Sequence, residues 1–211
     1  GVLIVISVII PTLLWADLTN LYVWVALVSM ILFAMVGFMD DYLKVVNQRS
    51  LGLRVVQKLV LQGLIGLGIA LTLIALKGIN LYSGSLSVPF FKRFTPDMDL
   101  VILGASTFIP LVLFTLLVII GSSNAVNLTD GLDGLASGLV IIAASALTVL
   151  TYVTGHADFA TYLDLIKNTY ASELTIFCGA MVGAALGFLW YNSFPAQIFM
   201  GDVGSMSLGG A

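Results

Sequence analysis

The sequence predicts an all-α fold, a polytopic bundle of membrane-spanning helices. Of its 211 residues, 60% are hydrophobic and only 9% are charged, and the mean hydropathy is +1.11. A soluble domain is closer to half apolar and a quarter charged. Six apolar segments reach or approach the length of about 20 residues that a helix needs to cross a bilayer. Strict two-residue alternation is missing from them, which argues against a transmembrane β-barrel.

The predicted helices follow one another with short polar connections. They cover residues 2–16, 21–39, 59–76, 100–120, 135–154 and 174–191. The first segment is short and contains Pro11, which indicates a helix that has lost its beginning. Pro110 falls inside the fourth segment and predicts a kink there, because proline removes a backbone donor. We expect residues 1–211 to form one integral membrane domain, part of a longer one.

Six crossings divide the connecting segments between the two faces of the membrane. The two sets are 17–20, 77–99 and 155–173 on one face and 40–58, 121–134 and 192–204 on the other. The second face carries the unusual polar residues, namely Asp40, Asp41, Lys44, Arg49, Arg54, Lys58, Asn124, Asn127, Asp130, Asp133, Asn192 and Asp202. Each face has four Lys or Arg residues, so the positive-inside rule leaves the orientation open.

The longest connection, 77–99, contains a candidate hairpin. Residues 81–89 alternate partly between apolar and polar around Gly84, which is typical of two short strands. An irregular loop fits the same pattern equally well.

Several function classes are disfavoured by composition. The net charge of −3 does not suggest a nucleic-acid partner. The single cysteine, Cys178, lies in an apolar run and cannot form an internal disulfide. The single histidine, His156, is expected to be a surface residue. Without a His/Cys cluster a zinc site is not expected, and without a Walker-type glycine loop an ATP-driven pump is not expected.

The first polar motif is the pair Asp40-Asp41, followed by Lys44. Adjacent residues on a helix do not share a face. One carboxylate can therefore point into a site while the other braces the backbone or holds a cation. Alternatively, both acids mark the water boundary, with Lys44 as their partner.

The second motif spans residues 124–134 and contains two amides and two acids. Asn127, Asp130 and Asp133 are spaced i, i+3, i+6, so they share a face if this stretch begins a helix. A helix N-terminus with free amides suits a phosphate. The alternative is that Thr129 and Asp130 simply cap the following helix.

The third motif is Asp202, which lies between glycines just before another apolar run and can also be read as a helix cap. Five aspartates on one face would repel one another, so such a site needs cations. Lys44 and Lys58 can supply two. A divalent ion with oxygen ligands is the natural complement, and Mg²⁺ is usual where the substrate carries phosphates.

Two function classes remain: an enzyme acting on a phosphorylated substrate at the membrane face, and a transporter that uses membrane acids. Transporters place such acids near the middle of the bilayer, in broken helices. Here the acids lie at the ends of the predicted spans, which favours the enzyme.

The three motifs resemble those of the polyprenyl-phosphate hexosamine-1-phosphate transferases. They read DDYLK at residues 40–44, NAVNLTDGLDGLA at 124–136 and PAQIFMGDVGS at 195–205. The resemblance covers essentially the whole chain, including the segments 50–54 and 88–92. The second and third motifs are most similar to the members that transfer phospho-N-acetylmuramoyl-pentapeptide. The alternative is a sister enzyme that transfers N-acetylglucosamine-1-phosphate.

The resemblance implies a ten-helix, Mg²⁺-dependent enzyme of the bacterial inner membrane, with its active site facing the cytoplasm. Its substrates would be UDP-N-acetylmuramoyl-pentapeptide and undecaprenyl phosphate, and its products UMP and the first lipid-linked precursor of peptidoglycan. Members of this family often pair through their helices, so a homodimer is also expected. A His-rich motif and further helices of the family lie outside these 211 residues.

The resemblance also implies roles for individual residues. Asp40, Asp41 and Asp202 match the family's three essential aspartates. Asp202 would be the Mg²⁺ ligand, and Asp40 the base that deprotonates the lipid phosphate, with Asp41 as its support. Direct attack and a covalent aspartyl intermediate both fit these residues. The positions that would line the nucleotide and diphosphate site are Lys44, Lys58, Asn127, Asp130, Asp133 and Asn192. Phe199 would stack on uracil.

Overall fold

The computed structural model is a helix bundle, and it describes the chain apart from residues 49–51, 89–90, 92–93 and 103–104. Its longer helices are α1 (Val2–Trp15), α2 (Leu21–Val46), α3 (Val55–Gly78), α4 (Ile109–Thr129), α5 (Leu135–Gly155) and α7 (Leu174–Asn192). The shorter elements are β1 (Leu100–Ile102), β2 (Ala105–Thr107), α6 (Ala157–Tyr162), the 3₁₀ helix η1 (Thr169–Glu173) and α8 (Gly201–Gly209). Within the described residues, five helices are long and apolar enough to cross a membrane, and α1 is a shorter apolar helix. The predicted polytopic helix bundle is confirmed.

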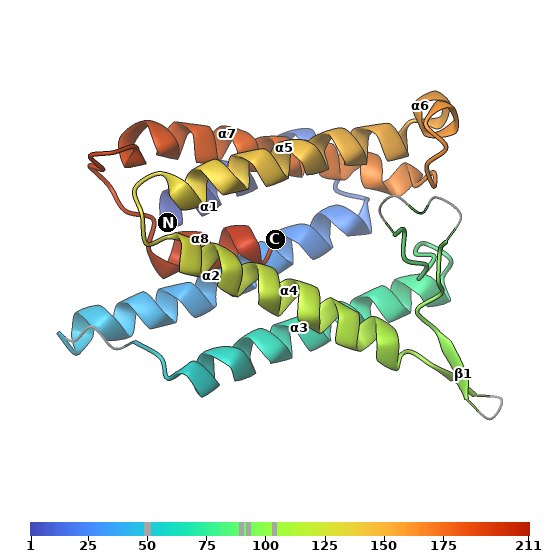
Figure 1. Cartoon of the computed structure of the whole chain (residues 1–211), viewed down its shortest axis with the longest axis horizontal. Helices are drawn as coiled ribbons and strands as arrows, with labels where there is room; N and C mark the ends of the chain where they lie inside the picture. Colours follow the sequence, from blue (N-terminus) through green and yellow to red (C-terminus); the bar gives the residue numbers. More distant parts are fainter. Residues whose placement is uncertain (49–51, 89–90, 92–93, 103–104) are drawn as a thin grey trace.

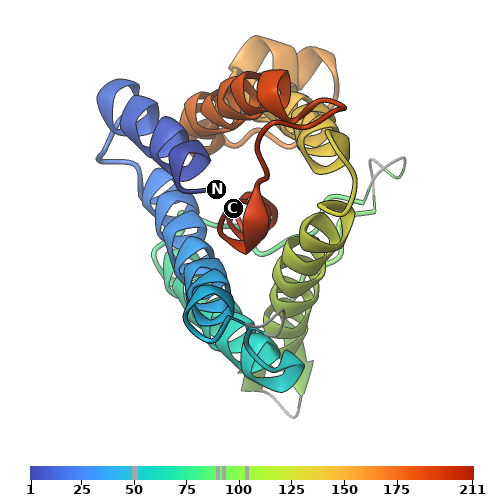
Figure 2. The same cartoon turned by 90° about the vertical axis from the view of Figure 1, so that its left-hand side faces the viewer.

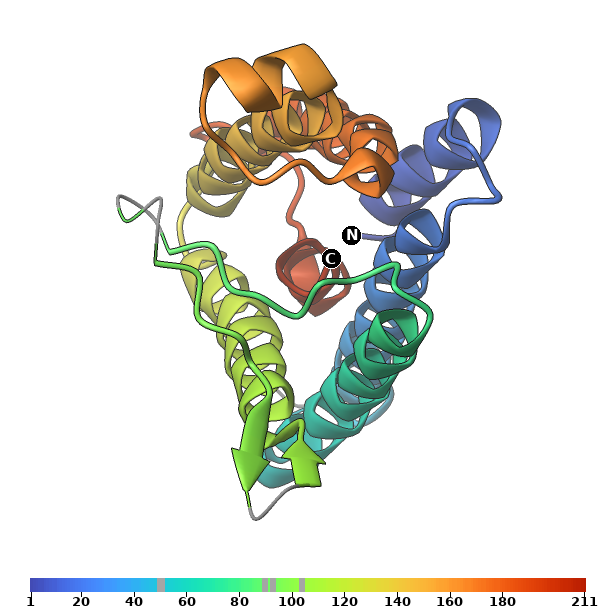
Figure 3. The ribbon, with the colours of Figure 1, turned by 90° about the vertical axis from the view of Figure 1, so that its right-hand side faces the viewer.

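The long helices surround α8, which lies at the centre of the bundle (Figures 1 and 2). Helices α5 and α7 run along each other with α1 beside α7, and α3 runs along α4. Figure 3 shows the same ring from the opposite end, with β1 and β2 projecting below α3 and α4. A buried apolar core joins α1, α2, α5, α7 and α8.

Helix α8 packs closely against α2, with the two helix backbones next to each other. At Gly37 of α2, an added Cβ would lie 2.2 Å from the carbonyl oxygen of Asp202. Only glycine permits this approach. Met206 of α8 is fully buried against Phe33 and Val36 of α2. The start of α8 is therefore placed beside the C-terminal half of α2.

The ends of three helices differ from the prediction, and one of them is α3, which begins at Val55 rather than at residue 59 and so carries Lys58. Helix α2 continues beyond Met39 to Val46, so the Asp40-Asp41 pair lies on the helix itself. The predicted fourth span, 100–120, is wrong, because α4 begins at Ile109 and continues to Thr129. Pro110 then lies in the first turn, where no intrahelical donor is lost, and the predicted kink is wrong too. The apolar residues before it form β1 and β2.

The structure pairs strands in the 77–108 region, although not as predicted. Gly84 is not a turn between strands: its carbonyl accepts from the amide of Met98, and Leu86 donates to Pro96, both at 3.0 Å. The only named hairpin in the described part of the chain joins β1 and β2, with Leu100 opposite Thr107. Of the predicted hairpin residues, position 89 lies outside the described ones.

The three polar motifs lie at one end of the bundle, at the left of Figure 1. That end gathers the C-terminal ends of α2, α4 and α7 and the N-terminal ends of α3, α5 and α8. Cys178 is buried in the core, as predicted. His156 is exposed at the opposite end, in contact with the ring of Phe159.

Candidate active site

Asp40 lies in the last turns of α2 and is almost completely buried, at 3% exposure. Its Oδ1 accepts a hydrogen bond of 2.8 Å from the amide of Leu53, and its Oδ2 lies 2.6 Å from Nζ of Lys44. Lys44 is four residues further on, so the two side chains share a helix face. A Cβ on Gly52 would lie 2.6 Å from the Asp40 carboxylate, so a larger residue there would displace this side chain from its contacts.

Asp41 points to a different partner. Its Oδ2 accepts from the amide of Val203 at 3.2 Å, in the first turn of α8, and its side chain is 32% exposed. Nζ of Lys44 lies 3.4 Å from its Oδ1. The neighbouring acids thus brace two different segments, while both face the Lys44 ammonium.

Asp202 completes this group from the first turn of α8. Its Oδ2 lies 3.0 Å from Nζ of Lys44 and 3.2 Å from Nζ of Lys58, and its Oδ1 accepts from Nδ2 of Asn127 at 2.8 Å. Lys58 in turn donates to Oδ1 of Asn127 at 3.1 Å. We call this set the charged cluster; it comprises Asp40, Asp41, Lys44, Lys58, Asn127 and Asp202.

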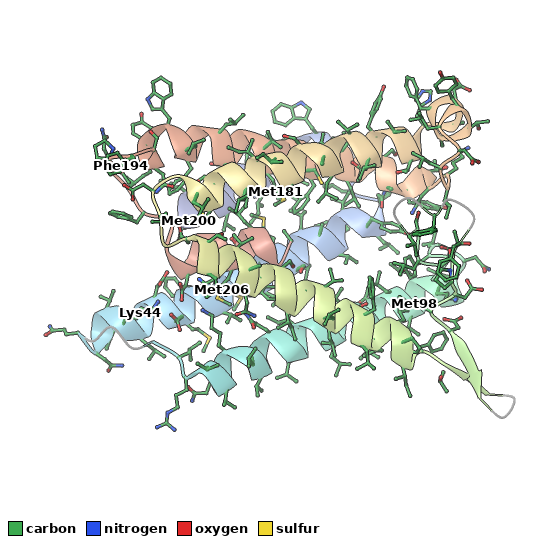
Figure 4. The ribbon with its side chains drawn as sticks, viewed as in Figure 1. Lys44, Met98, Met181, Phe194, Met200 and Met206 are labelled. Carbon is green, nitrogen blue, oxygen red and sulfur yellow. The ribbon has the colours of Figure 1, made fainter. Side chains whose placement is uncertain are left out.

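The charged cluster holds residues from four helices, α2, α3, α4 and α8. Figure 4 places Lys44 at the end of the bundle that also carries Phe194, and Met98 at the opposite end. Burial alone would raise the pKa of Asp202. Hydrogen bonds from Asp40, Asn127 and Lys44, together with the charge of Lys58, outweigh it and lower this pKa. Asp202 is therefore ionised at neutral pH.

The carboxylates of the charged cluster fit a divalent cation. Asp40, Asp41 and Asp202 can each offer one oxygen, and these oxygens lie within 4.8 Å of one another. Carboxylate oxygens are the ligands that Mg²⁺ prefers. The Lys44 ammonium already contacts all three acids, so the site accepts positive charge. The cluster thus brings three carboxyl groups together with two ammonium groups.

A second group of predicted residues lies on two loops, 130–134 and 193–200, which we call the paired loops. Asn192, at the end of α7, connects them. Its Oδ1 accepts from the amide of Gly134 at 3.1 Å and from Oγ of Ser137 at 3.0 Å, and its Nδ2 donates to the carbonyl of Ile198 at 2.9 Å. Asn192 is only 3% exposed, so the structure places it within the protein rather than on the wall of the site.

The other members of the paired loops are more accessible. Asp133 is exposed, and its Oδ2 accepts from the amide of Ala196 at 3.0 Å. Phe199 is 75% exposed. Asp130 is half-buried and accepts from the amide of Gly201, which joins the paired loops to the start of α8. Burial and the nearby charge of Asp202 raise the pKa of Asp130 to about 6.

The predicted helical face through Asn127, Asp130 and Asp133 is wrong. Asn127 lies in the last turn of α4, Asp130 follows as its C-cap, and α5 begins only after Gly134, which has a φ of +75°. Thr129 and Asp130 therefore do not cap α5. The helix N-terminus in the site is that of α8 instead.

Sequence reasoning missed Ser205. It is fully buried in α8, and its Oγ accepts from Nδ2 of Asn127 at 2.9 Å. Its position three residues after Asp202 was the available signal, since residues i and i+3 lie on one helix face. Arg49, grouped with the polar residues of this face, lies outside the described residues.

These features define a class of protein, a multi-pass membrane protein with an acidic site at one end of its helices. Residues 23–211 match the family described as glycosyl transferase family 4. The chain belongs to this family.

Curated relatives align along the whole chain. It is 55% identical to a phospho-N-acetylmuramoyl-pentapeptide-transferase of Koribacter versatilis and 54% identical to that of Solibacter usitatus. It is 49% identical to the enzyme of the same name in Citrifermentans bemidjiense. In each case all of this chain is covered, but only 57%, 57% and 56% of the relative. The chain thus spans little more than half the length of these relatives.

Proposed function

We propose that the protein to which this chain belongs transfers phospho-N-acetylmuramoyl-pentapeptide from its UDP conjugate to undecaprenyl phosphate. The observation that carries this proposal is the charged cluster, three carboxylates and two lysines that meet at one end of a membrane bundle. An anionic diphosphate needs cations and amide donors beside it, and the cluster offers both. The names of the curated relatives support the same reaction.

The reaction exchanges one phosphorus–oxygen bond for another. An oxygen of the lipid phosphate attacks the phosphorus that carries the sugar, and a new P–O bond forms. The bond from that phosphorus to the bridging oxygen breaks, and this oxygen leaves with UMP. Phosphoryl transfer of this kind requires mainly positioning and neutralisation of charge. The lysines of the charged cluster, Lys44 and Lys58, are suited to both tasks.

We propose Mg²⁺ as the cofactor, held by Asp202 with Asp40 and Asp41 beside it. When bound, it would neutralise charge on the diphosphate oxygens. Asn127, which donates to Asp202, fixes the orientation of that carboxylate. Asp41, which accepts from the first turn of α8, fixes the helix that carries it.

Asp40 is proposed as the group that takes the proton from the lipid phosphate. Its carboxylate lies beside that of Asp202, since Nζ of Lys44 contacts both, at 2.6 and 3.0 Å. Asp41 is the second candidate, because it is the more exposed of the pair, with a side-chain exposure of 32% against 5%. The Asp40→Asn and Asp41→Asn variants distinguish them.

The paired loops are proposed to hold the nucleotide. Phe199 offers an exposed ring on which uracil can stack, and Asp130 and Asp133 offer acceptors for the uridine. Asn192 is buried beneath this surface and holds the two loops together. In the cell, we place this end of the bundle on the cytoplasmic side of the bacterial inner membrane, where UDP-linked precursors are found.

The deciding experiment measures UMP release by the full-length protein in liposomes that contain undecaprenyl phosphate. The protein should release UMP from UDP-N-acetylmuramoyl-pentapeptide and should not release it from UDP-N-acetylglucosamine. Preference for the second substrate would identify the sister enzyme. Ion movement without UMP release would identify a transporter instead.

A further inference from the structure

Two amide side chains face each other one helical turn below the charged cluster. Nδ2 of Asn124 donates to Oε1 of Gln62 at 2.8 Å, and Nε2 of Gln62 lies 3.4 Å from Oδ1 of Asn124. Gln62 is fully buried, and Asn124 also donates to the carbonyl of Ile120 in its own helix at 2.8 Å. This contact joins α3 to α4 among apolar side chains.

Gln62 belongs to a stripe along α3 that packs against α4. The stripe runs through Lys58, Gln62 and Gly66, which are spaced four residues apart. Gly66 permits close contact, because an added Cβ would lie 2.9 Å from the side chain of Leu116. Small residues of this kind let membrane helices approach closely. They do not by themselves fix the position of one helix along the other.

The amide pair and the contacts of Lys58 in the charged cluster depend on the same alignment of α3 along α4. In the antiparallel pair of α3 and α4, Lys58 faces Asn127 and Gln62 faces Asn124. A slip of one turn would move α3 by about 5.4 Å along α4. A slip in one direction would bring Lys58 level with Asn124 and leave Gln62 without a partner, and a slip in the other would bring Gln62 level with Asn127 and leave Asn124 without one. Either slip strands one amide in an apolar layer, which is costly. The same slip would take Lys58 away from Asp202.

We propose that the Gln62–Asn124 pair fixes the register of α3 against α4 and thereby positions Lys58 and Asn127 on Asp202. Both are positioning residues, since they act on the site through other side chains. A single buried polar pair is a well-attested device for specifying the register of packed helices. The effect on catalysis rests on the proposed transferase function, whereas the effect on register does not.

The test compares Gln62→Leu, Asn124→Leu and the double variant in the full-length protein. Each single change leaves one amide unpaired and should lower thermal stability, whereas the double change should restore it. We expect kcat to fall on the order of tenfold or more in all three, because misplacing a catalytic group has such effects. In a Lys58→Met background the same changes should lower kcat no further. If kcat instead recovers with stability in the double variant, the role is merely structural and the proposal is wrong.

A register measurement needs no activity. Spin labels at Val56→Cys of α3 and Leu128→Cys of α4, both highly exposed positions, report the distance between these helices in a background without other cysteines. The distribution should be narrow in the parent and shifted or broadened by Gln62→Leu. Thr151→Val, which removes the contact between Thr151 and Thr175 on α5 and α7, is the matched control and should change neither distance nor kcat. An unchanged distance in Gln62→Leu would refute the proposal. Absence of UMP release by the parent would refute only the transferase function.

Discussion

The charged cluster and the paired loops lie at the same end of the bundle but use their polar atoms differently. In the charged cluster, side chains from four helices contact one another and bring three carboxyl groups together with two ammonium groups. In the paired loops, Asn192 and Asp133 accept from backbone amides, and their hydrogen bonds hold one loop to the other. The first arrangement can bind a cation and a diphosphate, while the second gives a stable shape to a surface that carries Phe199. Substitutions in the charged cluster should therefore affect kcat, and those in the paired loops KM and stability.

The largest effect is expected from Asp202→Asn. This change removes the charge that holds both lysines and the proposed cation, so turnover should fall by about 10³-fold or more. UMP release by the full-length protein at several Mg²⁺ concentrations measures it. Asp158→Asn makes the same chemical change at an exposed position in α6, at the opposite end, and should be neutral. Full activity of Asp202→Asn at saturating Mg²⁺ would rule out its proposed role.

Asp40→Asn should lower turnover by about 10²- to 10³-fold if this acid is the base, with little change in the binding of the UDP substrate. The second pKa of a phosphate monoester is about 6. At higher pH the lipid phosphate has already lost its proton, so the defect should shrink as the pH rises from 6 to about 8. Rates measured across this range test it, with Asp41→Asn in parallel. A defect that does not vary with pH would argue against a role as base.

In the paired loops, Asn192→Leu should chiefly reduce stability. It leaves the amide of Gly134, the hydroxyl of Ser137 and the carbonyl of Ile198 without partners, at a cost of about 1–3 kcal/mol. Thermal unfolding and KM for the UDP substrate are the measurements. Asn192→Asp keeps the acceptor for Gly134 and Ser137 and should be milder. A normal melting temperature together with a lost kcat would place Asn192 in the chemistry instead.

A smaller effect is expected from Phe199→Ala. Loss of a stacked ring should raise KM for the UDP substrate by about three- to tenfold, and kcat should change little. Phe199→Tyr keeps the ring and should behave like the parent. Phe194→Ala, at another highly exposed phenylalanine of the same loop, is the matched control. Equal effects at the two positions would mean that neither ring stacks specifically.

The smallest effect concerns Asp130. Because its pKa is raised to about 6 in the folded protein, the folded state holds this proton more tightly than the unfolded chain does. Its contribution to stability is complete below a pH of about 4 and is lost as the pH rises through 6. The melting temperature should therefore fall over this window more steeply in the parent than in Asp130→Asn. Identical slopes would contradict the raised pKa.

Sequence reasoning succeeded where apolar length and helix geometry determine the answer. The spans ending near Thr154 and Tyr191 lie within one residue of the ends of α5 and α7. It failed at α4, because the apolar residues before Pro110 pair as strands while the polar residues Asn124 and Asn127 continue the helix. Those amide side chains are tolerated in the helix because Gln62 and Lys58 on α3 form hydrogen bonds with them. Such partners cannot be identified from local sequence.

The sequence by itself determined that this is a membrane helix bundle with five aspartates, Asp40, Asp41, Asp130, Asp133 and Asp202, at one face, because the length and order of apolar segments dictate both. The resemblance of its motifs to the family also pointed to Asp40, Asp41 and Asp202 as the expected site residues. Only the tertiary structure decided that Asp40 is buried under Gly52 while Asp41 binds the start of α8. Likewise, only the packing of α8 inside the ring brought Asp202 to Lys44 and Lys58, which lie far from it in the chain. Contacts between distant segments depend on how helices cross, and local sequence carries no record of that geometry.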